Sequence, residues 1–357
     1  MTTEPAKQER VLVIKPSSFG DVIHTLPAVA ALKKAHPHWD IQWLVNEEWV
    51  PLLEGHPDLE EVIPFPRRDF RGLGALLQAR KWAVENLAPR HFDRVIDLQG
   101  LLRSALLAKA CGAKHVCGFR QAREGASFFY DEKINLPDWK KLHAIQRYMR
   151  LAQSQGALDD DEQPLSFWLP AGEKVQGMVR EDGRPLVILH PFSRGLGKSL
   201  TEQEVSEFCQ SLQQHHAEVQ IALLGSDSWQ GQTLPANTLD LMGKTNLPQL
   251  IWCLRQADTV VSVDSGPMHL AAAISDRLIS IHTWTDPAVV GPFQKGAWIW
   301  RDGLLIQVAQ LEAGQLPEQR KRKKLIEELR QRTGRLLPEG SMAKLAQAAS
   351  PEGVFAK

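Results

Sequence analysis

The chain has 357 residues, of which 43% are hydrophobic and 24% charged, so its composition is that of a folded globular protein long enough for two domains. Its 42 basic and 42 acidic residues give a net charge of zero, which predicts no nucleic acid as a partner, and its N-terminus is too polar for a signal peptide. With 4 cysteines but no Cys-x-x-Cys pair, no His-Glu-x-x-His motif and no apolar run near the ~20 residues of a membrane span, the sequence predicts a cytoplasmic protein without a disulfide framework or a dedicated metal site.

The first half of the chain alternates short apolar runs with segments of helical periodicity. Strands are predicted over 11–15, 41–45, 62–65, 92–98 and 116–119. Helices are predicted over 22–32, 73–87, 101–111 and, as a longer amphipathic segment, 143–155. Because this alternation is typical of βαβ units, we expect a parallel sheet with helices on both faces. The acidic run at 159–164 ends in proline and is interpreted as a linker, which places the first domain at 1–163.

The turn after the first predicted strand has the sequence Ser17-Ser18-Phe19-Gly20-Asp21 and opens a helix. It does not contain Gly-x-Gly-x-x-Gly, so it lacks the fingerprint of a dinucleotide site. An acid in the first turn of a helix is explained by the helix dipole alone. At a ligand-binding edge, however, the Asp21 carboxylate can take a proton from a substrate hydroxyl, which makes it a candidate general base.

The second half repeats the pattern and predicts a second α/β domain over 164–335. Strands are predicted over 186–190, 219–224, 240–241, 259–263 and 278–283. Helices are predicted over 202–214, 247–256, 268–274 and 317–332. The last of these carries the basic run at 320–324, which is interpreted as a solvated helix face, with contact to anionic lipid head groups as the alternative. The remaining segment, 336–357, is expected to be a tail or helix that packs back on the N-terminal domain.

The loop after the strand at 186–190 has the composition of an anion site. It holds Ser193, Arg194 and Lys198 just before a helix, whose free N–H groups and partial positive charge favour a phosphate. The triplet Gly197-Lys198-Ser199 matches the end of a mononucleotide P-loop, but Phe192 occupies the position where that motif needs glycine. We therefore expect a phosphate site that is not a P-loop, the alternative being a solvated turn with incidental charge.

A second turn, Asp264-Ser265-Gly266, follows the strand at 259–263 and opens another helix. The N–H groups of Ser265 and Gly266 can hold a further phosphate. One turn later, His269 is either a core histidine bonded to Asp264 or a ligand of the same anion. Elsewhere in this half, Asp227 can accept hydrogen bonds from ribose hydroxyls, and Met242 can contact a flat base, although methionine is more often a core residue.

All these turns follow the carboxyl ends of strands, where parallel sheets bind their ligands, so we expect the two domains to present them to each other across a cleft. Arginines cluster in similar positions in the first half and suit an acidic substrate through bidentate pairing. The alternative for each arginine is an incidental place on the surface. The cations concerned are Arg67, Arg68, Arg71, Arg103 and Arg123.

Together these motifs resemble one family. The stretch 15–28, KPSSFGDVIHTLPA, resembles the opening of the bacterial lipopolysaccharide heptosyltransferases of glycosyltransferase family 9, and 263–270, VDSGPMHL, resembles their late nucleotide-binding motif. Intermediate motifs at 97–104 and 118–124 are most similar to those of heptosyltransferase I. The resemblance implies a GT-B fold of two Rossmann-like domains and the transfer of heptose from ADP-heptose with inversion. It also implies that no metal or other cofactor is needed.

The resemblance also implies roles for individual residues, with Asp21 as the catalytic base and Lys198 as the catalytic group on the donor phosphates. The donor would further contact Ser193, Arg194, Asp227, Met242, Asp264, Ser265, Gly266 and His269. The acceptor would contact Ser18, Gly20, Arg67, Arg68, Arg71, Arg103 and Arg123. That acceptor would be an acidic inner-core sugar (Kdo or heptose) on lipid A, which implies cell-envelope biosynthesis in the cytoplasm with peripheral contact to the anionic inner membrane.

Two alternatives to a heptosyltransferase remain at this stage. One is another nucleotide-sugar enzyme of the same architecture, either an epimerase or a transferase with a different donor. The other is a non-catalytic protein that binds nucleotide sugars. The pairing of Asp21 with Lys198 argues against the second, because a protein that only binds an anionic ligand has no use for a carboxylate beside it.

Overall fold

The computed structural model describes residues 8–72, 74–158, 165–176, 178, 183–311 and 319–356, with only the backbone at 319 and 320. The chain divides into two compact units, Met1–Pro170 and Ala171–Lys357. The break falls at 170, beyond the predicted boundary at 163, and the predicted linker at 159–164 lies outside the described residues. Each unit is built around a mainly parallel sheet, which confirms the predicted α/β class.

In the described part of the first unit, six strands form a sheet of order β3-β2-β1-β4-β5-β6, and all neighbouring pairs are parallel. The strands are β1 (Arg10–Ile14), β2 (Asp40–Asn46), β3 (Glu61–Phe65), β4 (Arg94–Asp97), β5 (His115–Phe119) and β6 (Glu132–Ile134). Four consecutive apolar residues of β1, Val11 to Ile14, are fully buried, as expected for a central strand covered on both faces. The sequence pattern predicted the first five strands but not β6.

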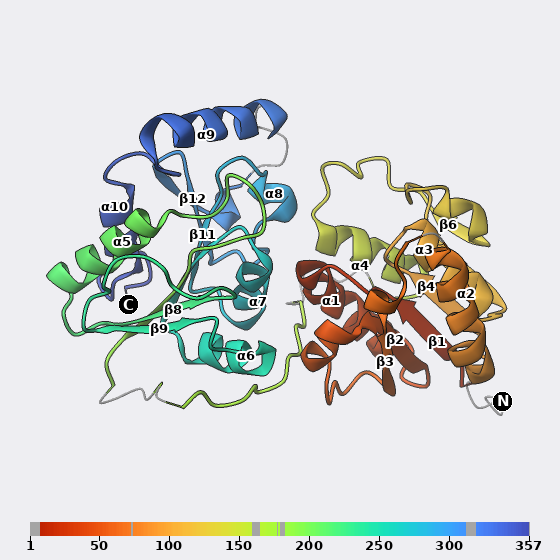
Figure 1. Ribbon diagram of the computed structural model, residues 1–357. Coiled ribbons are helices and arrows are strands. Elements are labelled where there is room, and N and C mark those ends of the chain that lie inside the picture. The colour runs from red at the N-terminus through yellow and green to blue at the C-terminus, as the bar shows by residue number, and fades with distance from the viewer. Residues whose placement is uncertain are drawn as a thin grey trace. The chain divides into compact units, whose positions relative to one another are not determined.

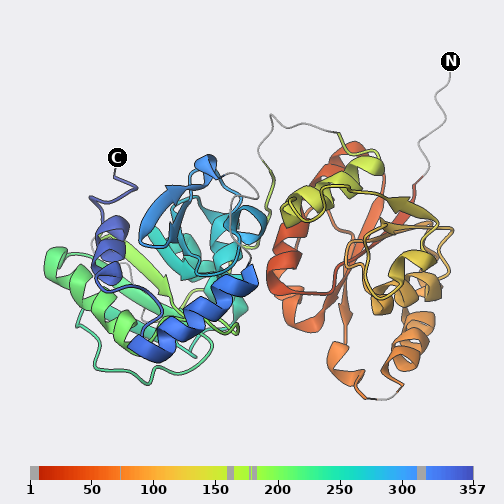
Figure 2. The same cartoon turned by 90° about the horizontal axis from the view of Figure 1, so that it is seen from above.

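Helices cover both faces of this sheet. They are α1 (Phe19–Ala35), α2 (Ala75–Asn86), α3 (Leu102–Ala110) and α4 (Ala144–Ser154). Figure 2 shows α1 and α4 on one side of the strands and α2 and α3 on the other. All four helices were predicted, although the first residue of the predicted helix 73–87 lies outside the described residues.

The described part of the second unit contains a sheet of order β13-β12-β11-β10-β7-β8-β9, in which only β13 runs antiparallel to its neighbour. The strands are β7 (Leu186–His190), β8 (Gln220–Gly225), β9 (Thr238–Met242), β10 (Thr259–Val263), β11 (Leu278–Ile281), β12 (Trp298–Arg301) and β13 (Leu304–Gln307). The predicted strands correspond to β7 through β11, while the hairpin of β12 and β13 was not predicted.

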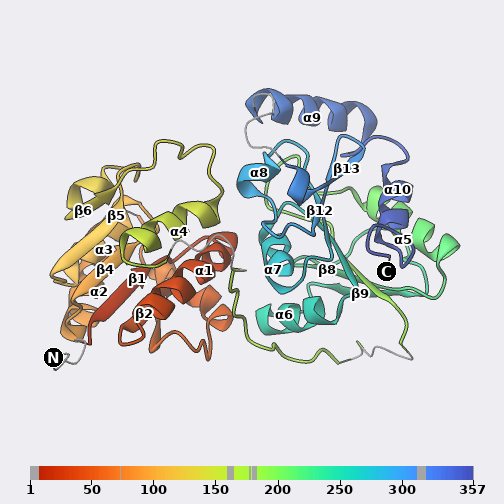
Figure 3. The same ribbon diagram turned by 180° about the vertical axis from the view of Figure 1, so that it is seen from behind.

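The helices of the second unit are α5 (Glu202–His215), α6 (Leu247–Gln256), α7 (Gly266–Ile274), α8 (Pro287–Val290), α9 (Gln319–Thr333) and α10 (Ser341–Ala349). Figures 1 and 3 show α5 and α10 together on one face of the sheet and α6 and α7 on the other. Within the described ranges, no helix is both long and apolar enough to cross a membrane.

The C-terminal segment packs in the second unit, so the prediction that it packs back on the N-terminal domain is wrong. Its apolar residues, including Met342 and Leu345, are buried in the core of the second unit against α5. The buried Glu204 of α5 accepts hydrogen bonds from the backbone N–H groups of Leu336 (2.9 Å) and Leu337 (2.7 Å). This carboxylate satisfies two amides at the start of the segment and fixes its course along α5.

The first six strands of each sheet follow the same order, so that the first lies beside the fourth: β1 beside β4 in the first unit and β7 beside β10 in the second. At such a point the chain leaves neighbouring strands in opposite directions, which opens a crevice at their carboxyl ends. The loops that follow these four strands therefore occupy the positions where this architecture binds ligands. The predicted groups Asp21, Lys198 and Asp264 all lie in or beside these loops.

Candidate active site

In the first unit the central candidate is Asp21, the third residue of α1. Its Oδ2 accepts hydrogen bonds from the Ser18 backbone N–H (3.1 Å), as in a capping box at the start of the helix, and from the Ser18 hydroxyl (2.7 Å). Its Oδ1 accepts a hydrogen bond from the Tyr148 hydroxyl of α4 (2.8 Å) and lies 3.8 Å from Lys15 Nζ. The side chain is nevertheless 35% exposed, so a substrate hydroxyl can reach it.

Electrostatics keep this carboxyl ionised. Burial alone would raise the pKa of Asp21, but the charge of Lys15 and the hydrogen bonds from Ser18 and Tyr148 together outweigh it and lower that pKa. Burial lowers the pKa of Lys15 and raises the pKa of Tyr148 well above its ordinary value, so the tyrosine remains a hydrogen-bond donor. Asp21 is therefore a charged proton acceptor at neutral pH.

The Tyr148→Phe substitution should move the titration of Asp21 to higher pH. It removes a hydrogen bond that stabilises the ionised carboxyl, so the pKa of Asp21 rises toward its ordinary value. The carboxyl is ionised above its pKa and loses its charge as pH falls through that value, so the variant loses the charge at a higher pH than the wild type.

The measurement is carbon-13 NMR of the aspartate carboxyl carbons during an acid titration. Tyr130→Phe, which removes a hydrogen bond to Asp97 (2.7 Å), is the control and should leave Asp21 unchanged. An Asp21 midpoint unmoved in Tyr148→Phe would contradict this reading.

Lys15 and Tyr148 were not identified from the sequence as site residues. Tyr148 is 127 positions from Asp21 and reaches it because α4 packs against α1. Lys15 is held by the carbonyl of Leu98 (3.2 Å) and lies 4.7 Å from the centre of the Tyr148 ring. No local pattern links these positions, although Lys15 belongs to the opening motif.

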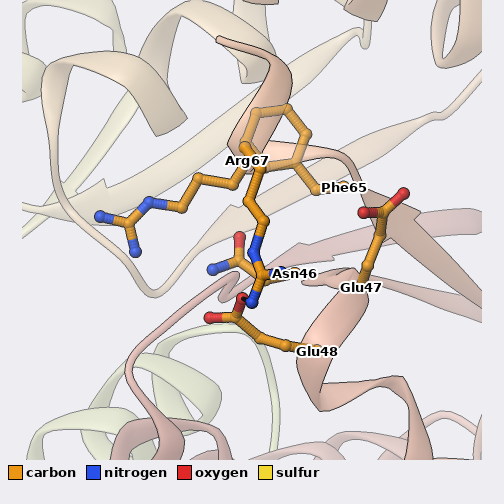
Figure 4. Close-up of a pocket in the computed structure, with 6 residues that line it drawn as sticks. Asn46, Glu47, Glu48, Phe65 and Arg67 are labelled. Atoms are coloured by element: carbon orange, nitrogen blue, oxygen red, sulfur yellow. Dashed lines mark ion pairs between the residues drawn. The ribbon is translucent and has the colours of Figure 1, made fainter. Parts of the chain in front are cut away.

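A pocket of about 320 Å³ opens beside the same turn, at the carboxyl ends of β2 and β3. Its lining consists of Asn46, Glu47, Glu48, Phe65, Arg67 and Arg68 (Figure 4). The pocket adjoins the turn because the backbone N–H of Asn46 donates to the carbonyl of Pro16 (3.1 Å) and the Trp49 ring stacks on Phe19 at 4.9 Å. It therefore lies at the same sheet edge as the capped carboxylate of α1.

The pocket combines charged groups with an unsatisfied amide. The Asn46 side chain is 1% exposed, and neither its oxygen nor its nitrogen has a hydrogen-bond partner among the described residues. Arg68 lies 3.6 Å from Glu48, and the structure gives Arg67 no ion-pair partner within the described part of the chain. A buried amide without a partner is costly, so this pocket is suited to a polar ligand that both donates and accepts hydrogen bonds. Asn46 was not recognised from the sequence.

The other predicted acceptor residues are placed less closely. Gly20 is buried in the first turn of α1. The charge of Arg123 reaches Lys15 and helps to lower the pKa of that lysine. Arg71 is exposed and Arg103 half-buried on α3, and neither is among the described residues that line the pocket.

In the second unit the centre of the site is an ion pair between two predicted residues. Lys198 Nζ lies 2.6 Å from Asp264 Oδ2, although 66 positions separate the residues in the sequence. The loop after β7 carries the lysine and the end of β10 carries the acid, so the pair spans the crevice between two neighbouring strands. The lysine is 18% exposed and the acid 7% exposed, so the lysine is the partner that a ligand can reach.

Asp264 is held as an anion by its surroundings. Burial would raise its pKa, but the neighbouring His282 and Lys198, with hydrogen bonds from Lys198 and Thr285, lower it overall. The Thr285 hydroxyl donates to Asp264 Oδ2 (2.7 Å) and contacts His282 Nδ1 (3.0 Å). Burial lowers the pKa of His282 to about 4, so this histidine is neutral near pH 7. The result is a fixed lysine beside an ionised acid.

The loop that carries Lys198 is fastened by the residues after β11. The Thr283 hydroxyl donates to the carbonyl of Gly197 (2.7 Å), and the Trp284 indole N–H donates to the carbonyl of Leu196 (3.2 Å). Lys198 Nζ lies 5.0 Å from the centre of the Trp284 ring. None of the residues from 282 to 285 was predicted to be a site residue, although 282 and 283 belong to the predicted strand 278–283.

Ser193 and Ser265 lie at the two helix-opening loops of the second unit. The Ser199 hydroxyl accepts a hydrogen bond from the backbone N–H of Ser193 and donates one to its carbonyl, both at 2.9 Å. Ser265 is the residue before α7, and its hydroxyl lies 3.3 Å from His190 Nδ1. Burial lowers the pKa of His190 to about 4. His269 is half-buried one turn into α7 and close enough to His282 to affect the pKa of that residue.

Three predicted donor residues lie outside this cluster. Arg194 and Asp227 are exposed. Met242 is only 1% exposed and belongs to the core, where it packs so closely on Gly225 that a Cβ there would clash with its methyl carbon. Of the two readings left open for Met242, its position favours the core residue.

Comparison with known proteins is consistent with this arrangement. The model of the family described as glycosyltransferase family 9 (heptosyltransferase) matches residues 80–311. Over 302 residues the chain is 31% identical to lipopolysaccharide heptosyltransferase 1 of Escherichia coli O18:K1:H7, which covers 82% of this chain and 91% of the relative.

Two solved structures extend the comparison. The crystal structure of a family 9 glycosyl transferase from Veillonella parvula covers 98% of this chain and 99% of its own, with a TM-score of 0.76 and 20% identity. E. coli heptosyltransferase WaaC with ADP-2-deoxy-2-fluoro heptose covers 90% of this chain and 99% of its own, with a TM-score of 0.66 and 27% identity.

Proposed function

The chain belongs to glycosyltransferase family 9, the heptosyltransferases, and we propose that it transfers heptose from ADP-heptose to an acidic inner-core sugar of lipopolysaccharide. The observation that carries this proposal is the fixed Lys198–Asp264 pair at the strand-order reversal of the second sheet, beside the N-terminus of α7. A lysine and the free N–H groups of a helix start suit the diphosphate of a nucleotide sugar. The similarity to a heptosyltransferase solved with an ADP-heptose analogue supports the same donor.

In the proposed reaction, Asp21 removes the proton of an acceptor hydroxyl as that oxygen attacks the anomeric carbon of the donor. The bond between that carbon and the diphosphate oxygen breaks, and ADP leaves with the electron pair. A single displacement of this kind inverts the anomeric centre. The lowered pKa of Asp21 keeps it ionised and ready to accept the proton at neutral pH.

The charge that grows on departing ADP would be stabilised by groups already in place. These are Lys198, the Ser193 hydroxyl and the N–H groups of Ser265 and Gly266. Positive groups of this kind can take the part that a metal ion has in other transferases, so we propose that the reaction needs no metal. Arg194, Asp227 and His269 remain proposed contacts of the donor, whereas the burial of Met242 favours a core role over contact with the base.

The pocket beside Asp21 supports an acidic sugar as the acceptor. Arg67 and Arg68 suit its carboxylate, and the unsatisfied amide of Asn46 suits its hydroxyls. Ser18, Gly20, Arg71, Arg103 and Arg123 remain proposed contacts of the same acceptor. Because such a sugar is attached to lipid A, we propose that the protein works at the cytoplasmic face of the inner membrane.

The test combines the protein with ADP-heptose and lipid A that carries Kdo, with and without EDTA, and follows products by NMR. We expect heptosylated acceptor with the anomeric configuration opposite to that of the donor, at a rate that EDTA leaves unchanged. UDP- and GDP-sugars should give no product. Conversion of the donor in the absence of acceptor would instead indicate an epimerase, and binding of ADP-heptose without any conversion would indicate a non-catalytic protein.

A further inference from the structure

The helix α9, which carries the basic run, lies beside the loop that carries Lys198. A Cβ added at Gly197 would lie 3.5 Å from Cγ2 of Ile326, so the helix passes close to that loop. Figure 1 shows α9, in dark blue, lying along one end of the second unit. The helix that carries the run is therefore close to the proposed donor site.

Arg322 fastens α9 to the segment that follows β11. Its Nε and Nη2 donate to the carbonyl of Thr283 (3.2 and 3.0 Å), and Nη2 also pairs with both carboxylate oxygens of Asp302 (2.5 and 2.7 Å). The side chain is only 16% exposed. The guanidinium of Arg322 is thus engaged in hydrogen bonds within the protein, and it fixes α9 relative to Thr283. The hydroxyl of Thr283 in turn donates a hydrogen bond to the carbonyl of Gly197.

The next residue of the helix brings a second lysine to Trp284. Lys323 Nζ lies 5.5 Å from the centre of the indole ring, and Lys198 Nζ lies 5.0 Å from the same centre. Lys198 has the buried Asp264 as its partner, whereas Lys323 is 39% exposed and has the partly exposed Glu327 at 3.9 Å. An exposed pair at that distance is weak, so Lys323 is free to turn toward a stronger anion.

We propose that Lys323 is a second cationic ligand of the donor's diphosphate, placed beside Lys198 by the packing of α9 on Trp284 and by the anchor at Arg322. Because the two ammonium groups lie 5.0 and 5.5 Å from the centre of the same indole ring, the exposed Lys323 can turn toward a diphosphate that is bound at Lys198. The inference rests on the proposed function, since it takes Lys198 as a ligand of a nucleotide diphosphate. It separates the basic run into a donor-side member, Lys323, and an outward member, Lys324, which is 80% exposed.

The experiment is calorimetric titration of the full-length protein with ADP and with adenosine. Lys323→Ala should weaken ADP binding about tenfold, because it removes one charge-assisted contact, and should leave adenosine binding unchanged. Lys323→Arg should keep ADP binding within about twofold of wild type. Lys324→Ala is the matched control: it removes the same charge one residue away and should leave both ligands unaffected. Thermal unfolding of each variant checks that the fold is retained.

The outcomes separate this inference from the proposed function. If the wild-type protein binds ADP but Lys323→Ala behaves like Lys324→Ala, the inference is overturned and the proposed function stands. If the wild-type protein binds no ADP, both are overturned. Sedimentation with phosphatidylglycerol vesicles adds a further arm. If both alanine variants lose vesicle binding equally and keep full ADP affinity, the run is a lipid-binding face and Lys323 is not a donor ligand.

Discussion

Asp21→Asn is expected to lower kcat by a factor on the order of 10³, because the variant cannot accept the proton of the attacking hydroxyl. Asparagine keeps the size of aspartate but loses the negative charge 3.8 Å from Lys15 Nζ. Affinity for ADP should remain within about twofold of wild type, because Asp21 lies in the first unit and the proposed diphosphate ligands lie in the second. Steady-state transfer from ADP-heptose and calorimetric binding of ADP measure the two quantities on the same samples.

A control separates loss of the base from loss of structure. Asp131→Asn removes an acid that pairs with Lys109 at the surface of the same unit (2.9 Å), and it should leave kcat unchanged. The thermal unfolding midpoint of Asp21→Asn shows whether Lys15, which loses its charge partner, disturbs the fold. A well-folded Asp21→Asn variant that retains near-normal turnover would mean that another group removes the proton.

Whether the place of a site residue could be predicted from the sequence depends on how far apart in the chain its contacts lie. Asp21 was predictable because its strand, turn and capping box are contiguous in the chain. Lys198 and Asp264 were predictable one at a time, since each follows a strand, and the parallel order of β7 and β10 brings them together. The contacts of Tyr148 with Asp21 and of Trp284 with Lys198 could not be predicted, because each depends on packing between segments that are distant in the sequence.

Two further differences have other physical causes. The hairpin of β12 and β13 could have been predicted from the sequence Asp302-Gly303, which is typical of a two-residue hairpin turn. The two residues form such a turn, with positive φ angles of 52° and 82°. The C-terminal helix left none. Its apolar face could be buried against the core of either unit. Its place in the second unit depends on Glu204, whose carboxylate accepts hydrogen bonds from the backbone N–H groups of Leu336 and Leu337.

Lys198→Ala is expected to lower kcat/KM for the donor by a factor of about 10² to 10³, because the lysine stabilises charge that grows on the leaving diphosphate. It should also weaken ADP binding, since ADP itself carries the diphosphate. The change is not a clean removal of one contact, however. Asp264 is 7% exposed, and without the lysine it becomes a buried acid whose hydrogen bond from Thr285 and neutral neighbour His282 do not balance its charge. An unpaired buried charge destabilises a fold by several kcal/mol.

The double variant Lys198→Ala/Asp264→Asn removes this ambiguity, because it removes both charges of the pair. If Lys198 acts on the donor, the double variant should regain thermal stability relative to Lys198→Ala while its ADP affinity and kcat/KM stay low. Lys198→Arg should keep part of the ADP affinity, since it retains the charge. If instead the double variant regains both stability and activity, then Lys198 serves to neutralise Asp264 and the diphosphate is held by other groups. Differential scanning calorimetry, ADP titration and donor kinetics on the four proteins decide between these two roles.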